Sequence, residues 1–332
     1  MSTPPNPSAT IVDLSTAFMS SRVIQVMAEL GVADALGDAP MSAGELAAKT
    51  KTNPDAMFRA LRLLVSYGIF AMTGDRFSHN EGSRLLRQDH PQSLRAWVRM
   101  MGAPLNWNTY GLFEHTMRTG EPARSELIEG DFFADYLPKH PELGKLFDES
   151  MTAAARQRIP AIVSAYDFSR YGTIADIGGG RGHLIDAVLA ATPSAKGILF
   201  DLPHVVARAE RRSGERLSVM AGSFFTDKLP VADAYLVMHV IHDWSDEESI
   251  DILKAVHRAA AKHAKLLLIE RVLTAGAESD MGKRMDIHML AALSGRERTR
   301  DEFEKLFNAA GFSLDRAILT PAGTSILEGS AR

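Results

Sequence analysis

The sequence predicts an α/β protein with a mostly parallel sheet in its C-terminal half, preceded by a helical N-terminal domain. Three observations carry this prediction. Strand-like and helix-like runs alternate from about Tyr166 onward, a glycine-rich turn opens that region, and the first 80 residues read as helices followed by a hairpin. Such alternation is typical of βαβ units, in which helices cover both faces of a parallel sheet.

Composition narrows the classes of function. The 332 residues are 45% hydrophobic and 23% charged, which is ordinary for a globular chain of roughly two domains. A net charge of −4 supplies no basic surface for nucleic acid or an anionic membrane. Cysteine is absent, which excludes disulfides, thiolate metal sites and a cysteine nucleophile. We therefore expect small-molecule partners, no nucleic acid and no membrane, in a reducing cytoplasm.

The N-terminal region predicts a winged helix-turn-helix. The first ten residues lack the signature of a signal peptide and predict a short disordered lead. Apolar residues then recur at helical spacing over 11–30, and Gly31 follows at a C-cap position. After one further helix, Asn53 and Pro54 open another, and a hairpin turns at Gly74.

Winged helices often bind DNA through a basic helix, so two roles compete for this module. The helix that begins at Pro54 offers only Arg59 and Arg62 as cations outside its apolar positions. We expect the module to be a packing and dimerisation scaffold. A ligand-sensing DNA-binding regulator is kept as the alternative.

The helical pattern continues to about residue 165, where strands begin to alternate with helices. Five runs read as strands: TIADIGGG, AKGILFDLP, LSVMAGSFF, DAYLVMHVI and KLLLIERVL. FSLDRAILT and TSILEG lie only a few residues apart, so the last pair is predicted to be antiparallel. The expected segments are a dimerisation domain over 1–100, a helical connector over 101–165 and a sheet domain over 166–332.

The glycine-rich segment IADIGGGRGHL follows a strand and precedes the apolar helix LIDAVLAA, which is where doubly wound folds bind a mononucleotide. It fails the dinucleotide pattern G-x-G-x-x-G in both registers, and no lysine follows as in a phosphate loop. What remains is Asp176 with Gly178, Gly180 and Gly182, whose backbone can approach a ligand closely.

A second acid, Asp201, ends the next strand 25 residues later, where an acid reaches ribose hydroxyls in nucleoside sites. Two carboxylates would repel a pyrophosphate and favour a ligand with positive charge. S-adenosylmethionine, which carries a ribose, a sulfonium and an ammonium group, matches these features.

Six motifs, DIGGGRG, DLPHVV, AGSFF, IHDWSDEES, IERVL and SGRERT, make the sequence resemble a known family. They occur in the order and spacing of the S-adenosylmethionine-dependent small-molecule O-methyltransferases, the plant caffeate-type group and its bacterial relatives. The resemblance implies a Rossmann-like class I methyltransferase sheet, a winged-helix dimerisation domain and a homodimer. The residues then expected to contact the cofactor are Asp176, Gly178, Gly180, Gly182, Asp201, Leu202, Ser223 and Phe224.

The segment HVIHDWSDEES places His242 at the carboxyl end of a strand, ahead of a capping box formed by Ser245 and Glu248. That edge of an open α/β sheet faces the ligand crevice. An imidazole, with a pKa of about 6.5, is well suited to take a proton from a phenol at neutral pH. The resemblance gives His242 this role of general base. Strand alternation predicts that His239 faces the other way.

Two glutamates, Glu270 and Glu297, match the family's paired acids beside the base. A carboxylate bonded to imidazole fixes its tautomer and stabilises the protonated ring. By spacing alone Glu297 reads as a solvated loop charge. The acids are not clustered with metal-ligand spacing, so no metal is expected.

The chain departs from the family at two cofactor positions. Ser223 stands where the family often has an acid, and Met238 stands where plant members carry a lysine. Ser223 can still hydrogen-bond the cofactor and Phe224 can stack on it, so we expect cofactor binding to be retained but rearranged.

By resemblance, the acceptor contacts are Phe147, Met151, Asp243 and Met289. Core packing is the competing interpretation for the methionines and the phenylalanine. An apolar, flexible lining implies a flat aromatic acceptor. The sequence thus predicts methyl transfer from S-adenosylmethionine to an aromatic hydroxyl, with N-methylation of a heteroaromatic acceptor as the alternative within the same class.

Overall fold

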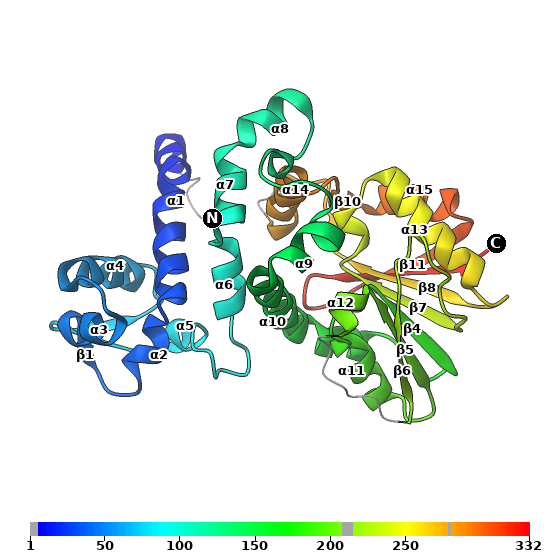
Figure 1. The fold of residues 1–332 in the computed structure, drawn as a ribbon, viewed down its shortest axis with the longest axis horizontal. Coiled ribbons are helices and arrows are strands. Elements are labelled where there is room, and N and C mark those ends of the chain that lie inside the picture. The colour runs from blue at the N-terminus through cyan, green and yellow to red at the C-terminus, as the bar shows by residue number, and fades with distance from the viewer. Residues whose placement is uncertain (1–5, 208–214, 278–279) are drawn as a thin grey trace. The chain divides into compact units, whose positions relative to one another are not determined.

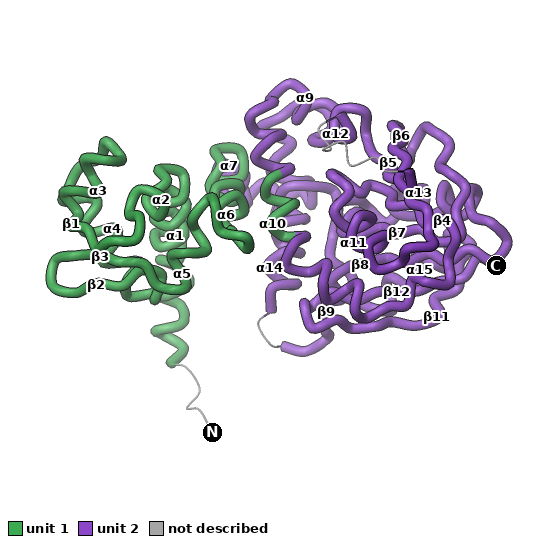
Figure 2. The backbone as a smooth tube through the Cα atoms, turned by 90° about the horizontal axis from the view of Figure 1, so that it is seen from below, with its two compact units in different colours: residues 1–107, 149–154 green, residues 108–148, 155–332 purple. Residues whose placement is uncertain are grey.

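The computed structural model describes residues 6–207, 215–277 and 280–332. The chain divides into two compact units, residues 1–107 with 149–154 and residues 108–148 with 155–332 (Figure 2). The long helix α10 (Pro141–Ala165) contributes to both units. The expected three segments, with boundaries at residues 100 and 165, stay a prediction.

The first unit is helical with a small antiparallel sheet. Its helices are α1 (Pro7–Glu29), α2 (Val32–Leu36), α3 (Ala43–Thr50), α4 (Pro54–Ser66), α5 (Glu81–Arg84), α6 (Arg95–Met101) and the first part of α7 (Pro104–Gly111). Its strands are β1 (Met41–Ser42), β2 (Ala71–Thr73) and β3 (Arg76–Ser78), in the order β1-β3-β2. Helices α3 and α4 followed by the β2–β3 hairpin are the succession that the sequence predicted.

Local sequence signals explain the helix starts in this unit. Asn53 caps α4 by accepting a hydrogen bond from the amide of Ala56 at 3.0 Å. Helix α1 begins at Pro7, with Asn6 as its N-cap, so the prediction of a disordered lead is wrong from Pro7 onward because the cap was missed. Residues 1–5 of that lead lie outside the described residues.

The second unit contains a seven-stranded sheet in the order β11-β12-β8-β7-β4-β5-β6. Its strands are β4 (Thr173–Ile177), β5 (Lys196–Asp201), β6 (Leu217–Ala221), β7 (Ala234–Met238), β8 (Lys265–Glu270), β11 (Phe312–Leu319) and β12 (Ser325–Ala331). Strands β4 to β8 pair in parallel, whereas β12 pairs antiparallel with β8 and β11. All seven predicted strands are confirmed, as is the antiparallel last pair. A short parallel pair joins β9 (Val272–Leu273) to β10 (Arg298–Thr299).

Helices cover both faces of the sheet (Figure 1). Helices α13 (Asp246–Ala259) and α15 (Arg300–Ala309) pack on one face, and α11 (His183–Ala191) and the last part of α10 pack on the other. Alternate strand residues therefore serve two cores: Tyr235 and Val237 of β7 point to the first face, and Leu236 points to the second.

The remaining elements of this unit are short apart from α14. They are α8 (Phe113–Thr119), η1 (Ala123–Glu126), η2 (Phe132–Tyr136), α9 (Leu137–Lys139), α12 (Pro203–Val206), η3 (Ile241–Asp243) and α14 (Met281–Ala292). Across the described ranges, no helix is both long and apolar enough to span a membrane.

Candidate active site

Strand ends of the parallel sheet bring the predicted acids to one edge. Asp176 is the penultimate residue of β4, Asp201 ends β5 and Glu270 ends β8. The carboxyl ends of parallel strands share one edge of a sheet, which is where ligands bind in open α/β folds. The candidate site therefore occupies the edge that the sequence predicted.

A loop of glycines joins β4 to α11 at this edge. Gly178, Gly180 and Gly182 have φ angles of 66°, 59° and 79°, which residues other than glycine rarely adopt. The carboxylate of Asp201 accepts hydrogen bonds from the amides of Gly180 at 2.8 Å and Leu202 at 2.7 Å. These bonds tie the loop to the end of β5. Burial raises the pKa of Asp201 to about 6, although the two backbone hydrogen bonds lower it.

Asp176 lies beneath the loop and fits a cationic or hydrogen-bonding ligand. Its side chain is 1% exposed, and its Oδ2 atom has no hydrogen-bond partner. Burial raises the pKa of this carboxyl to about 7. A Cβ atom on Gly179 would lie 2.6 Å from the Asp176 Cγ, so only glycine allows the loop to lie this close to the acid. A buried acid with an unused oxygen suits the amino and hydroxyl groups of S-adenosylmethionine.

Ser223 and Phe224 follow β6 in a tight turn. The Ser223 amide donates to Asp227 at 2.8 Å, and the Ser223 hydroxyl accepts from the Phe225 amide at 3.3 Å. The Phe224 ring lies beside the glycine loop, 3.8 Å from the position of a Cβ on Gly178, and meets Trp244 edge-on at 5.8 Å. The structure thus brings Phe224 to the glycine loop, while the Ser223 hydroxyl bonds within the turn after β6.

His242 lies in η3, which follows β7 after His239 and Val240. Its Nδ1 is 3.0 Å from Glu297 Oε1, and its Nε2 is 3.5 Å from Asp243 Oδ1. A carboxylate at Nδ1 selects the tautomer with hydrogen on that nitrogen, which leaves Nε2 of the neutral ring as a proton acceptor. The predicted capping box is confirmed, since Ser245 and Glu248 exchange bonds at 3.0 and 3.2 Å.

Glu270 was expected to bond to the His242 ring, but its partners are different. Its Oε1 accepts from the amides of Val240 at 3.1 Å and Ile241 at 3.0 Å. Its Oε2 lies 3.4 Å from Nδ1 of His239. Glu270 therefore holds the backbone before His242 and acts on the ring through its charge, whereas Glu297 bonds to the ring directly.

The prediction that His239 faces away from His242 is wrong. The two rings lie 5.2 Å apart between centroids. Strand β7 ends at Met238, and His239 takes a φ of 52°, so the alternation of the strand no longer sets its direction. His239 is a site residue that sequence reasoning missed, and a strand end next to a second histidine was its only signal.

The carboxylates around His242 dominate its electrostatics. Burial by itself lowers the pKa of His242, but the charges of Glu270 and Asp243 and the bond to Glu297 outweigh burial and raise the pKa to about 10. Burial raises the pKa of Asp243 to about 7 against the opposing charge of His242. For Glu270, the His242 charge and the bonds from His239 and Ile241 outweigh burial and lower the pKa.

Within the described ranges, His239, His242 and Glu270 form a group whose ligand atoms lie within 4.8 Å of one another, which is close enough to bind a metal ion. Some of their atoms have partners: Nδ1 of His242 bonds to Glu297, and Oε1 of Glu270 accepts from the backbone. Nε2 of His239 and Oε2 of Glu270 are buried without a hydrogen-bond partner, and that Oε2 lies 3.4 Å from Nδ1 of His239. The expectation of no metal stays a prediction.

The predicted acceptor residues lie in several elements. Phe147 of α10 belongs to an aromatic cluster in which it meets Phe132 and Phe133 edge-on, each at 5.8 Å, and Phe133 lies 6.0 Å from Trp244. Met289 is 4% exposed in α14. Met151 is 37% exposed and lies in the part of α10 that belongs to the first unit.

The fold and the site together define the class of protein. A mixed seven-stranded sheet with a glycine loop, two strand-end acids and a histidine bonded to a buried glutamate is the arrangement of an α/β methyltransferase. Comparison with known proteins then gives the family. Residues 135–313 match an O-methyltransferase domain, and residues 12–89 match an O-methyltransferase dimerisation domain.

Individual relatives agree with this assignment. The chain is 39% identical to a phenazine O-methyltransferase, PhzM, of Lysobacter antibioticus, over 97% of this chain and 95% of the relative. It is 37% identical to an O-demethylpuromycin-O-methyltransferase of Streptomyces alboniger, over 94% and 85%. The crystal structure of LaPhzM matches with a TM-score of 0.93 at 38% identity, covering 99% of this chain and 100% of that one. CalO1, a methyltransferase in calicheamicin biosynthesis solved with S-adenosylhomocysteine bound, matches with a TM-score of 0.86 at 32% identity, covering 98% of each.

The chain therefore belongs to the O-methyltransferase family that carries an N-terminal dimerisation domain, with plant and bacterial members. It is an S-adenosylmethionine-dependent O-methyltransferase. This outcome confirms the resemblance predicted from the motifs and decides for an enzyme over the regulator.

Proposed function

We propose that the chain methylates a hydroxyl group of a small, flat aromatic acceptor, with His242 as general base. The observation that carries this proposal is the 3.0 Å bond between His242 Nδ1 and the buried Glu297. S-adenosylmethionine supplies the methyl group on a positively charged sulfur, which accepts the electron pair of the broken C–S bond. Nε2 of His242 takes the hydroxyl proton as the acceptor oxygen bonds to the methyl carbon, a contribution of about 10²- to 10⁴-fold.

The two glutamates have separate roles in this proposal. Glu297 orients the ring and stabilises its protonated form after transfer. Glu270 fixes the backbone of Val240 and Ile241, and with it the position of His242. The surrounding carboxylates raise the pKa of His242, so a cationic methyl donor close to the ring would favour the neutral form that accepts the proton.

We assign the cofactor to the glycine loop and its acids. Asp176 would hold the polar groups of the donor and Asp201 its ribose, while Phe224 would stack on the adenine. The residues assigned to the cofactor are Asp176, Gly178, Gly180, Gly182, Asp201, Leu202, Ser223 and Phe224. No metal takes part in this mechanism.

The acceptor is proposed to contact Phe147 of the helical connector, Asp243 and Met289. The expected contact with Met151 stays a prediction. Relatives with flat aromatic acceptors in their names support this class: one is a 3-amino-4-hydroxybenzoate 4-O-methyltransferase, 32% identical, and NcsB1 was solved with 1,4-dihydroxy-2-naphthoic acid. Products of this kind belong to secondary metabolism.

We further propose a cytoplasmic homodimer formed through the N-terminal domain. The matched dimerisation domain supports it, as do the apolar residues Ile11, Leu14 and Phe18 of α1, which are 68%, 73% and 56% exposed. Sedimentation velocity tests this assembly: the unchanged chain should sediment as a dimer, and Phe18→Asp should weaken the dimer. A monomer for the unchanged chain would contradict the proposal.

The test of the reaction is transfer of a labelled methyl group to hydroxyphenazines, 3-amino-4-hydroxybenzoate and 1,4-dihydroxy-2-naphthoic acid, with chelator present. We expect His242→Ala to reduce transfer to oxygen by two or more orders of magnitude while calorimetry shows unchanged donor binding. Transfer to nitrogen that survives the substitution would instead support N-methylation. A relative that is an N,N-dimethyltransferase, 34% identical, keeps that candidate open.

A further inference from the structure

Arg298 is a fully buried cation near the proposed base, and it takes no part in the proton transfer proposed for His242 and Glu297. It is 0% exposed and is the largest fully buried side chain in the described part of the chain. It begins β10, directly after Glu297. A guanidinium taken wholly out of water is costly unless each of its donors finds a partner, so such a residue requires an explanation.

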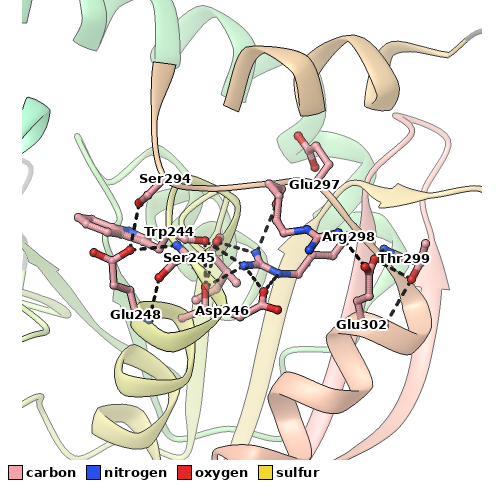
Figure 3. Close-up of polar contacts among 12 residues, drawn as sticks. Trp244, Ser245, Asp246, Glu248, Ser294, Glu297, Arg298, Thr299 and Glu302 are labelled. Carbon is pink, nitrogen blue, oxygen red and sulfur yellow. Dashed lines mark hydrogen bonds and ion pairs between the residues drawn. The ribbon is translucent and has the colours of Figure 1, made fainter. Parts of the chain in front are cut away.

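The partners of Arg298 come almost entirely from the segment that carries His242 (Figure 3). Its Nη1 donates to the carbonyl of Ile241 at 3.0 Å, and its Nη2 donates to the carbonyl of Trp244 at 2.9 Å. Its Nε and Nη2 both reach Asp246, at 2.9 and 2.8 Å. A longer bond to the Ser249 hydroxyl, at 3.3 Å, completes the set toward α13.

This pattern ties one rigid group to the segments of both His242 and Glu297. His242 lies between Ile241 and Trp244, the two residues whose carbonyls Arg298 holds. Glu297 is covalently next to Arg298, and its amide donates to Asp286 at 3.0 Å. The planar guanidinium therefore fixes the backbone of both partners of the bond between His242 Nδ1 and Glu297 Oε1.

The two segments also touch without room for a side chain. A Cβ on Gly295 would overlap the backbone of His242 and Asp243, including the His242 carbonyl. Close backbone approach at Gly295 and the Arg298 bonds act on the same pair of segments. Neither contact is needed to build the sheet, since Arg298 pairs only with the short strand β9.

We propose that Arg298 is a positioning residue for methyl transfer, which holds residues 241–246 against the segment of Glu297 and so sets the hydrogen bond between His242 and Glu297. The proposal rests on His242 being the base, as proposed above. Lysine cannot replace this function, because an ammonium group has three donors around one point and cannot span two carbonyls and a carboxylate.

The first test is the titration of His242, observed by NMR in the full chain with histidine labelled and S-adenosylhomocysteine present. His242→Gln identifies the signal. We expect Arg298→Lys to lower the titration midpoint by about one pH unit or more, because the carboxylate of Glu297 moves away from the ring. The control is Arg296→Lys, an exposed neighbour paired with Glu302, which should leave the midpoint in place.

The second test is kinetic, with S-adenosylmethionine and 1,4-dihydroxy-2-naphthoic acid as the probe acceptor. Arg298→Lys should lower kcat about 10- to 100-fold with little change in donor binding. In a cycle with Glu297→Gln, the double variant should lose no more than Glu297→Gln alone, because Arg298 acts through that bond. Multiplied losses, or an unchanged midpoint, would overturn the proposal.

Asp246→Asn repeats both tests if Arg298→Lys does not fold, since Asp246 is half exposed and its loss removes only the charge that holds the guanidinium. We expect a smaller shift in the same direction, and no shift would count against the proposal. Failure of the proposed function is distinguishable, because His242→Ala would then keep transfer while the titration still reports the geometry.

Discussion

The cofactor edge and the base segment lie side by side at one edge of the sheet but are built in different ways. The proposed cofactor edge, residues 176–182 with 201–202, is shaped mainly by the positive φ angles of its own glycines, and its bond between Gly180 and Asp201 crosses 21 residues. The base segment, residues 239–249, is held by groups from distant parts of the chain: Glu270, Glu297 and Arg298. The first region depends mainly on the backbone conformation of its glycines, and the second depends almost wholly on tertiary contacts. Substitutions should therefore change donor binding in one and chemistry in the other.

The largest expected effect is on the cofactor edge, for Gly178→Ala. An alanine here would have to adopt the positive φ of Gly178, which costs about 1–2 kcal/mol of conformational free energy. Its Cβ would also lie 2.7 Å from Val240 Cγ2. Relief of this contact requires the loop or the Val240 side chain to shift, so donor binding should weaken by about 100-fold in calorimetry. Gly180→Ala is the matched control, with a φ of 59° but no atom within 4 Å, and should weaken binding less. Equal effects would mean that strain alone decides.

In the base segment, Glu297→Gln should lower kcat rather than donor affinity, by about 10- to 100-fold at the optimal pH. A general base acts in its deprotonated form, so the rate rises with pH through the pKa of His242. Burial lowers that pKa, whereas Glu270, Asp243 and Glu297 raise it to about 10. Loss of the Glu297 charge should thus move the rising limb of the rate profile to lower pH. A limb that stays fixed, or moves upward, would separate Glu297 from the base.

The contrast also explains what the sequence could predict. The strands, the glycine loop and the Ser245–Glu248 capping box were predictable because each depends on residues within a few positions. The partners of Glu270 were not, because its bonds to Val240 and Ile241 cross 29 to 30 residues. Arg298 was not singled out from the sequence, since burial of a cation depends on carbonyls that only the fold brings to it.

His239 lies where the strand pattern stops, and substituting it should have an intermediate effect. Asparagine tolerates the positive φ of His239 and keeps a side-chain N–H donor, whereas leucine disfavours this φ and has no polar side-chain group. We expect His239→Asn to lower kcat by about threefold and His239→Leu by about tenfold, because leucine removes the ring nitrogen that lies 3.4 Å from the buried Oε2 of Glu270 and puts an apolar group in its place. Equal kcat values for the two variants would show that the His239–Glu270 contact does not support the base.

The smallest effect should come from Ser223→Ala, at the point where the sequence departs from the family. The Ser223 hydroxyl accepts from the amide of Phe225, and its own amide donates to Asp227, so the side chain is committed to the turn after β6. Its removal should change the dissociation constant of S-adenosylmethionine by less than about threefold in calorimetry, because one exposed neutral hydrogen bond is worth about 1 kcal/mol or less. A tenfold weaker constant would instead mean that the hydroxyl turns to the cofactor on binding, and that the cofactor edge extends from β5 to the end of β6.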